Sequence, residues 1–79
     1  MILTKLVDIL LRVKPNVKPD SVKMESKLIA DLGIDSLSMM LLAISVEDEF
    51  NIRFEGTPAF DTVQDICDYI ADKTGLQIQ

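Results

Sequence analysis

The sequence predicts an all-α fold, a small four-helix bundle with three main helices, one short helical turn and a long loop between the first two helices. Apolar residues recur at spacings of three and four in three separate segments, and proline or glycine marks where those segments stop. The chain has 79 residues, of which 48% are apolar, and this is enough for one small core. We therefore expect residues 1–79 to form a single domain.

The first helix is predicted at the start of the chain and should end before Pro15, because proline interrupts a helix. Its spacing of apolar residues gives one stripe that faces a core. The members of this stripe are Leu3, Leu6, Leu10 and Val13, with Ile2 and Ile9 alongside.

A long connection should follow the first helix, through Pro19 and Asp20 to about Ile34. A loop of this length is unusual in a small domain. We expect apolar residues to anchor it over the core, and these are Val17, Val22, Met24, Leu28 and Leu32.

The second helix is predicted from about Ser36 to Phe50, because Gly33 breaks the preceding segment and Asp35 can cap a helix. One of its apolar stripes is assigned to the core, namely Met39, Leu42, Ala43, Val46 and Phe50. A second stripe lies on a neighbouring face and consists of Leu37, Met40, Leu41 and Ile44. Either another element of the chain or a partner should cover that second face.

The final helix is predicted after an irregular segment over residues 51–61, in which one short helical turn should open at Pro58. Thr62 and Asp65 form a capping-box pattern at its start, and Gly75 should end it. The face that points to the core is Val63, Ile66, Cys67, Ile70 and Thr74. For Cys67 a buried structural thiol is favoured over a reactive one, because it lies in this apolar stripe.

Charge is distributed unevenly along the chain, whose net charge is −5. Residues 1–27 hold six basic and three acidic residues (net +3), whereas residues 28–79 hold two basic and ten acidic (net −8). We therefore expect no nucleic acid as a partner, because phosphate binding needs clustered basic residues. A basic protein partner fits better.

The residue inventory argues against an enzyme or a metal site. The chain has no histidine, so Ser36 has no such base beside it, and neither a hydrolase triad nor a typical zinc site is expected. The segment Glu47-Asp48-Glu49 lacks the alternating oxygen ligands and the glycine of a calcium loop, and we interpret it as a solvated face of the second helix.

We expect a monomeric, cytoplasmic protein that does not insert into a membrane. The longest apolar stretch, Met39 to Ile44, is too short to span one. Lys5 and Asp8 interrupt the region that a signal peptide would need to be apolar.

Ser36 is the candidate for chemical modification. It follows Asp35 at the predicted start of the second helix, where unpaired N–H groups and the helix dipole favour a phosphate on the serine oxygen. Asp-Ser before an apolar run is also an ordinary helix start, so these two residues alone leave both interpretations open.

The segment Asp31-Leu32-Gly33-Ile34-Asp35-Ser36-Leu37, with the helix end Val46-Glu47-Asp48-Glu49-Phe50 and the later segment 62–70, resembles the acyl carrier protein family. The resemblance implies that a phosphopantetheinyl transferase (a holo-ACP synthase) attaches 4′-phosphopantetheine from coenzyme A to Ser36, and that the arm then carries acyl groups as thioesters. Acyl-transferring and chain-elongating enzymes of fatty acid or specialised polyketide or lipid biosynthesis would be the further partners.

The resemblance also implies that Asp35 orients the transferase and its metal ion. The residues of the predicted docking face are Asp35, Leu37, Met40, Leu41, Ile44, Glu47 and Asp48.

Three residues depart from the family pattern. Leu41 stands where many fatty-acid carriers have glutamate, Ser38 where an acid is common, and Arg53 where the loop is often acidic. We therefore expect docking to depend more on apolar contact, and a specialised pathway fits at least as well as fatty acid synthesis. An aminoacyl or peptidyl carrier and an unmodified helical interaction module remain as alternatives.

Overall fold

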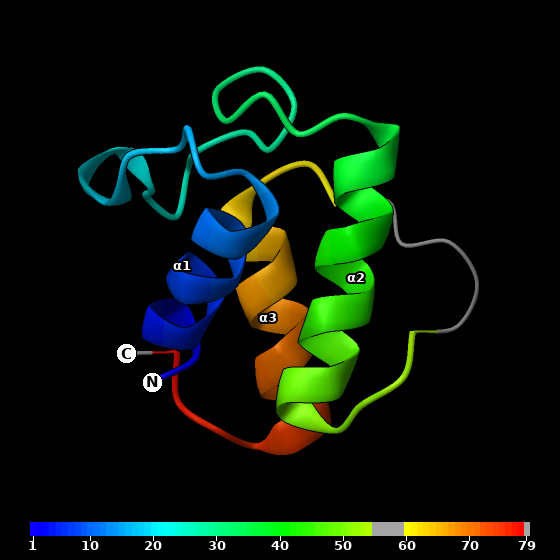
Figure 1. The fold of residues 1–79 in the computed structure, drawn as a ribbon. Helices are drawn as coiled ribbons and strands as arrows, with labels where there is room; N and C mark the ends of the chain where they lie inside the picture. The colour runs from blue at the N-terminus through cyan, green and yellow to red at the C-terminus, as the bar shows by residue number, and fades with distance from the viewer. Residues whose placement is uncertain (55–59, 79) are drawn as a thin grey trace.

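The fold is all-helical, as the sequence predicts, in a computed structural model that describes residues 1–54 and 60–78. The helices are α1 (Ile2–Val13), the 3₁₀ helix η1 (Pro19–Ser21), α2 (Ser36–Phe50) and α3 (Val63–Thr74) (Figure 1). The sequence did not predict η1, which interrupts the long connection between α1 and α2. The predicted short helical turn at Pro58 lies outside the described residues.

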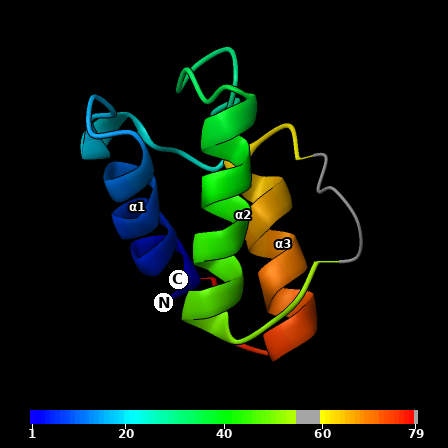
Figure 2. The same cartoon turned by 45° about the vertical axis from the view of Figure 1, so that its right-hand side comes forward.

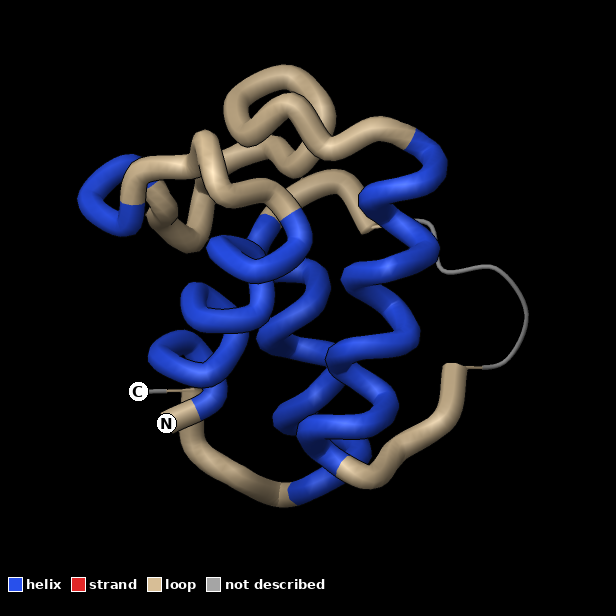
Figure 3. Tube along the Cα trace, in the orientation of Figure 1, coloured by secondary structure: helices blue, strands red, loops and turns tan. Residues whose placement is uncertain are grey.

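The three α-helices lie side by side, and the connection over residues 14–35 covers one end of them (Figure 3). α2 and α3 run in the same general direction and α1 runs the opposite way, as two views of the ribbon show (Figures 1 and 2). The N-terminus and the last described part of the chain lie at the end of the bundle where α1 begins. Across the described ranges, 1–54 and 60–78, no helix has the length and apolar character to cross a membrane.

The boundaries of α2 and α3 agree with the predicted caps. The Asp35 side chain accepts a hydrogen bond from the Ser38 N–H at the start of α2. Thr62 and Asp65 make both hydrogen bonds of a capping box at the start of α3. Gly75, at φ 74°, ends α3 in the left-handed conformation that glycine adopts without strain.

The start of α1 is completed by a distant segment of the chain. Within residues 1–54 and 60–78, no side chain caps this helix. Instead, the N–H groups of Ile2 and Leu3 donate to the carbonyl oxygens of Gln77 (3.2 Å) and Ile78 (2.8 Å). The segment after α3 therefore satisfies donors that a helix start otherwise leaves to solvent.

The core is formed by one buried face from each of α1, α2 and α3, together with residues of the connection. The predicted stripe of α1 is shifted, since Ile2 and Ile9 are fully buried whereas Leu3 and Val13 are half-buried. In α2 the buried residues include Ser38, and Met39 lies at the edge of the core. The fully buried core residues are Ile2, Leu6, Ile9, Leu10, Leu28, Ile34, Leu42, Val46, Val63, Ile66, Cys67 and Ile70.

The connection is held to the start of α3 by backbone hydrogen bonds. Leu28 N–H donates to the Asp61 carbonyl at 2.9 Å, and Val63 and Gln64 donate to the carbonyls of Ser26 (3.0 Å) and Met24 (2.9 Å). Leu28 is buried, as predicted for an anchor. These contacts fix the last part of the connection, which leads directly into α2.

Candidate functional site

Ser36 is the first residue of α2, and its side chain is exposed. The start of α2 lies at the end of the bundle that the connection covers (Figure 1). The Ser36 hydroxyl has no hydrogen-bond partner among residues 1–54 and 60–78. The hydroxyl is therefore open to solvent in the first turn of α2, and that helix begins where the sequence predicts.

The turn before α2 is anchored by one buried side chain, that of Ile34, whereas Gly33 and Asp35 are exposed. Gly33 adopts φ 70°, a conformation that most side chains disfavour, and its N–H donates to the Ile29 carbonyl. The following Ile34 is fully buried, and its N–H donates to the Leu28 carbonyl at 2.9 Å. The sequence did not predict this isoleucine as a core residue, and its burial fixes the turn two residues before Ser36.

Asp35 carries a negative charge next to Ser36. Hydrogen bonds from Ser38 lower the pKa of the Asp35 carboxyl, first from its backbone N–H, at 2.8 Å, and then from its side chain, and the positive charge of Lys14 contributes. Asp35 is therefore ionised throughout the neutral range. Ser38 is buried and holds this carboxylate in place. It stands at a position where an acid is common in the family that the sequence resembles.

The second apolar stripe of α2 is exposed, and we call its four residues the apolar face: Leu37, Met40, Leu41 and Ile44. Their exposed fractions are 68%, 60%, 46% and 58%. No other element in the described part of the chain covers them. This exposed face is therefore a candidate surface for contact with a partner.

The acidic side chains at the end of α2 make more contacts with the rest of the protein than a solvated face would. Only Asp48 fits that interpretation fully. The Glu47 carboxylate accepts a hydrogen bond from the Phe54 N–H at 2.8 Å, and Glu49 lies 3.9 Å from the Lys5 ammonium and 3.8 Å from the Arg12 guanidinium. Glu47 therefore has a structural role that the sequence did not reveal.

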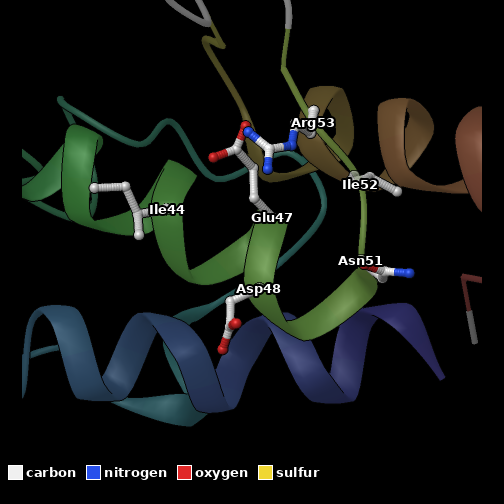
Figure 4. Close-up of a pocket in the computed structure, with 6 residues that line it drawn as sticks. All are labelled: Ile44, Glu47, Asp48, Asn51, Ile52 and Arg53. Carbon is white, nitrogen blue, oxygen red and sulfur yellow. The ribbon is translucent and has the colours of Figure 1, made fainter.

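An open cleft of about 440 Å³ lies at the end of α2. Figure 4 shows that Glu47 and Arg53 project to one side of it and Asp48 to the other. The cleft mixes two carboxylates with a guanidinium, so it lacks the single sign of charge that would favour one kind of ion. Its lining residues are Ile44, Glu47, Asp48, Asn51, Ile52 and Arg53.

Cys67 is fully buried in α3, as the sequence predicts, and burial raises its pKa to about 11. This pKa is higher than the pKa of the thiol in the unfolded chain, so the neutral thiol makes its full contribution to folding stability at neutral pH. That contribution is lost as the pH rises toward 11. Cys67 is therefore a structural residue rather than a nucleophile.

This burial predicts slow modification of the native thiol. In the unmodified protein at about pH 8, Ellman's reagent should react with Cys67 at least about 100-fold more slowly than in guanidinium, because reaction requires opening of the fold. Cys67→Ser should lose the signal in both conditions. Equal rates in the native and unfolded protein would contradict the burial.

The residues around Ser36 fit a covalently attached phosphate group. The serine oxygen is exposed, and the N–H groups of Ser36 and Leu37 have no acceptor within the described residues. The chain supplies no histidine to deprotonate the serine. The site is therefore suited to being modified by another enzyme rather than to catalysis of its own.

Comparison with known proteins agrees with this geometry. The sequence model of one protein family, described as the phosphopantetheine attachment site, matches residues 4–70. The chain is 44% identical over 57 residues to the acyl carrier protein of Wolinella succinogenes, which covers 70% of this chain and 75% of that protein. It is 40% identical over 57 residues to the acyl carrier protein of Campylobacter fetus, a match that covers 70% of this chain and 74% of that protein. It is 38% identical over 63 residues to the acyl carrier protein of Clostridium perfringens, with 77% of this chain and 83% of that protein covered.

Proposed function

Because the chain belongs to the acyl carrier protein family, whose members hold a covalent 4′-phosphopantetheine, it is a carrier rather than an enzyme, and we propose that Ser36 is the residue that holds the arm. The observation that supports this assignment most directly is the exposed Ser36 hydroxyl at the first position of α2, beside the ionised Asp35. We take residues 1–79 to act as one carrier domain.

The attachment reaction is a phosphoryl transfer that a separate phosphopantetheinyl transferase catalyses. The Ser36 oxygen forms a bond to the phosphorus that carries pantetheine in coenzyme A, the bond from this phosphorus to the adenosine 3′,5′-bisphosphate leaving group breaks, and the serine proton goes to a base of the transferase. Asp35 lies next to Ser36 and is ionised, so its carboxylate suits an interaction with the magnesium ion of the transferase. When bound, the arm supplies a thiol that holds an acyl group as a thioester.

We propose that partner enzymes dock on the apolar face of α2, next to Ser36. Asp35 and Asp48 are exposed at the two ends of this face and add negative charge, whereas Glu47 is partly engaged by the Phe54 N–H. The partners expected from the family are the transferase and biosynthetic enzymes that transfer or elongate acyl groups. Contact through apolar side chains should make their binding less sensitive to salt than a contact made by ion pairs.

A charge placed in the centre of the apolar face should weaken docking. Met40 lies one helical turn from both Leu37 and Ile44, so Met40→Glu should lower kcat/KM of the transferase for the unmodified protein about 10-fold or more, because a carboxylate would be desolvated at the contact. The matched control is Leu76→Glu, which changes an exposed leucine after α3. An equal effect of both variants would contradict the proposed docking face.

Acyl groups are the cargo that we propose, in fatty acid biosynthesis or in a specialised polyketide or lipid pathway, with the protein acting as a cytoplasmic monomer. The acidic end of α2 favours acyl over aminoacyl or peptidyl cargo. The exposed Leu41 and the presence of Arg53 favour a specialised pathway, because both replace acidic residues expected for fatty-acid carriers.

The decisive experiment is the intact mass of the purified protein before and after incubation with coenzyme A, magnesium and a broad-specificity phosphopantetheinyl transferase. A gain of one phosphopantetheine group supports the proposed function. No gain, under conditions that modify a known carrier, would favour an unmodified interaction module, which the exposed apolar face also fits.

A further inference from the structure

Attachment of the arm at Ser36 places two negative charges on adjacent residues. The phosphodiester adds one charge next to Asp35, which is already ionised. Like charges this close repel each other, and a nearby cation would offset this repulsion. The basic residues of segment 28–79 do not meet this need, since Arg53 follows α2 and Lys73 is near the end of α3, at the other end of the bundle from Ser36 (Figure 1).

Lys14 supplies a cation at the end of the bundle where α2 begins. It follows the last residue of α1, and its N–H donates to the Leu10 carbonyl at 2.7 Å, which fixes its backbone. Its side chain extends to the turn before α2, where its Cε lies 3.9 Å from the point that a Cβ on Gly33 would occupy. The stem of Lys14 therefore packs against a residue that is three positions before Ser36.

The Lys14 ammonium is also available for a new partner. It forms no ion pair within 4 Å in the described ranges, in which Lys5 and Arg12 pair with Glu49. Its charge is close enough to contribute to the lowered pKa of Asp35. Lysine combines a compact charge with a flexible stem, so the ammonium can move toward a phosphate without displacing the backbone.

We propose that Lys14 is a positioning residue for the arm, with its ammonium bound to the phosphodiester that links pantetheine to Ser36. This inference rests on the proposed function of Ser36. The contact offsets the repulsion from Asp35 and restricts the directions in which the arm leaves α2. Lys14 would then couple the end of α1 to the modified start of α2.

A thermodynamic cycle tests this contact without any measurement of carrier activity. Melting temperatures are measured for the unmodified and fully modified forms of the wild type and of Lys14→Met, which keeps the aliphatic stem and removes the charge. At low salt, the gain in Tm on modification should be about 3 °C larger in the wild type than in Lys14→Met. This difference should vanish in 1 M NaCl, where charges are screened. Lys14→Gln repeats the test should Lys14→Met not fold.

Two controls isolate the position and the charge. Lys14→Arg should retain the wild-type gain, and Lys73→Gln, which removes the same charge at the other end of the bundle, should retain it as well. Equal gains in the wild type and Lys14→Met at low salt, or a difference that persists in 1 M NaCl, would overturn the inference about Lys14 alone. A wild-type protein that gains no arm at Ser36 would overturn the proposed function and this inference together.

Discussion

Ser36→Ala should leave the mass of the protein unchanged after incubation with coenzyme A, magnesium and the transferase, whereas the wild type gains one phosphopantetheine group. The loss should be complete, because the variant lacks the oxygen that forms the phosphodiester. The Ser36 hydroxyl makes no hydrogen bond within the described residues, so the fold does not depend on it. Tm should therefore stay within about 4 °C of the wild type.

Ser45→Ala is the matched control, since it removes a serine hydroxyl from the same helix. This variant should be modified as fully as the wild type. Modification of Ser36→Ala, or loss of modification in Ser45→Ala, would move the attachment site away from Ser36. A large fall in Tm for Ser36→Ala would instead assign a structural role to the hydroxyl.

Leu42→Ala should reduce the free energy of unfolding by about 3 kcal/mol, the second large effect that we expect. Leu42 is 1% exposed, so its truncation both removes apolar contacts and leaves a cavity. A domain of this size has a total stability of roughly 4–12 kcal/mol, so the loss is a large fraction of the whole. Urea denaturation followed by circular dichroism measures it.

The adjacent Leu41 provides a control of identical chemistry. It belongs to the exposed apolar face, and Leu41→Ala should lower the free energy of unfolding by less than about 1 kcal/mol. In docking the order should reverse, with Leu41→Ala weakening partner binding more than a folded Leu42→Ala protein. Similar losses of stability in the two variants would contradict the orientation of α2.

The sequence by itself determined the features that depend on residues within one helical turn of each other. Thr62 and Asp65 form the predicted capping box, and Asp35 caps α2 at the predicted residue. The spacing of apolar residues also separated the core stripe of α2 from its apolar face. These features were predictable because i to i+3 and i to i+4 contacts follow directly from helix geometry.

Only the tertiary structure decided which distant residues meet. The carbonyls of Gln77 and Ile78 complete the start of α1, and the Glu47 carboxylate receives the Phe54 N–H. The approach of the Lys14 side chain to Gly33 depends on how the connection folds over the helices. Such contacts join segments whose separation in the chain has no fixed period, so they follow from the packing of the whole core rather than from any local pattern.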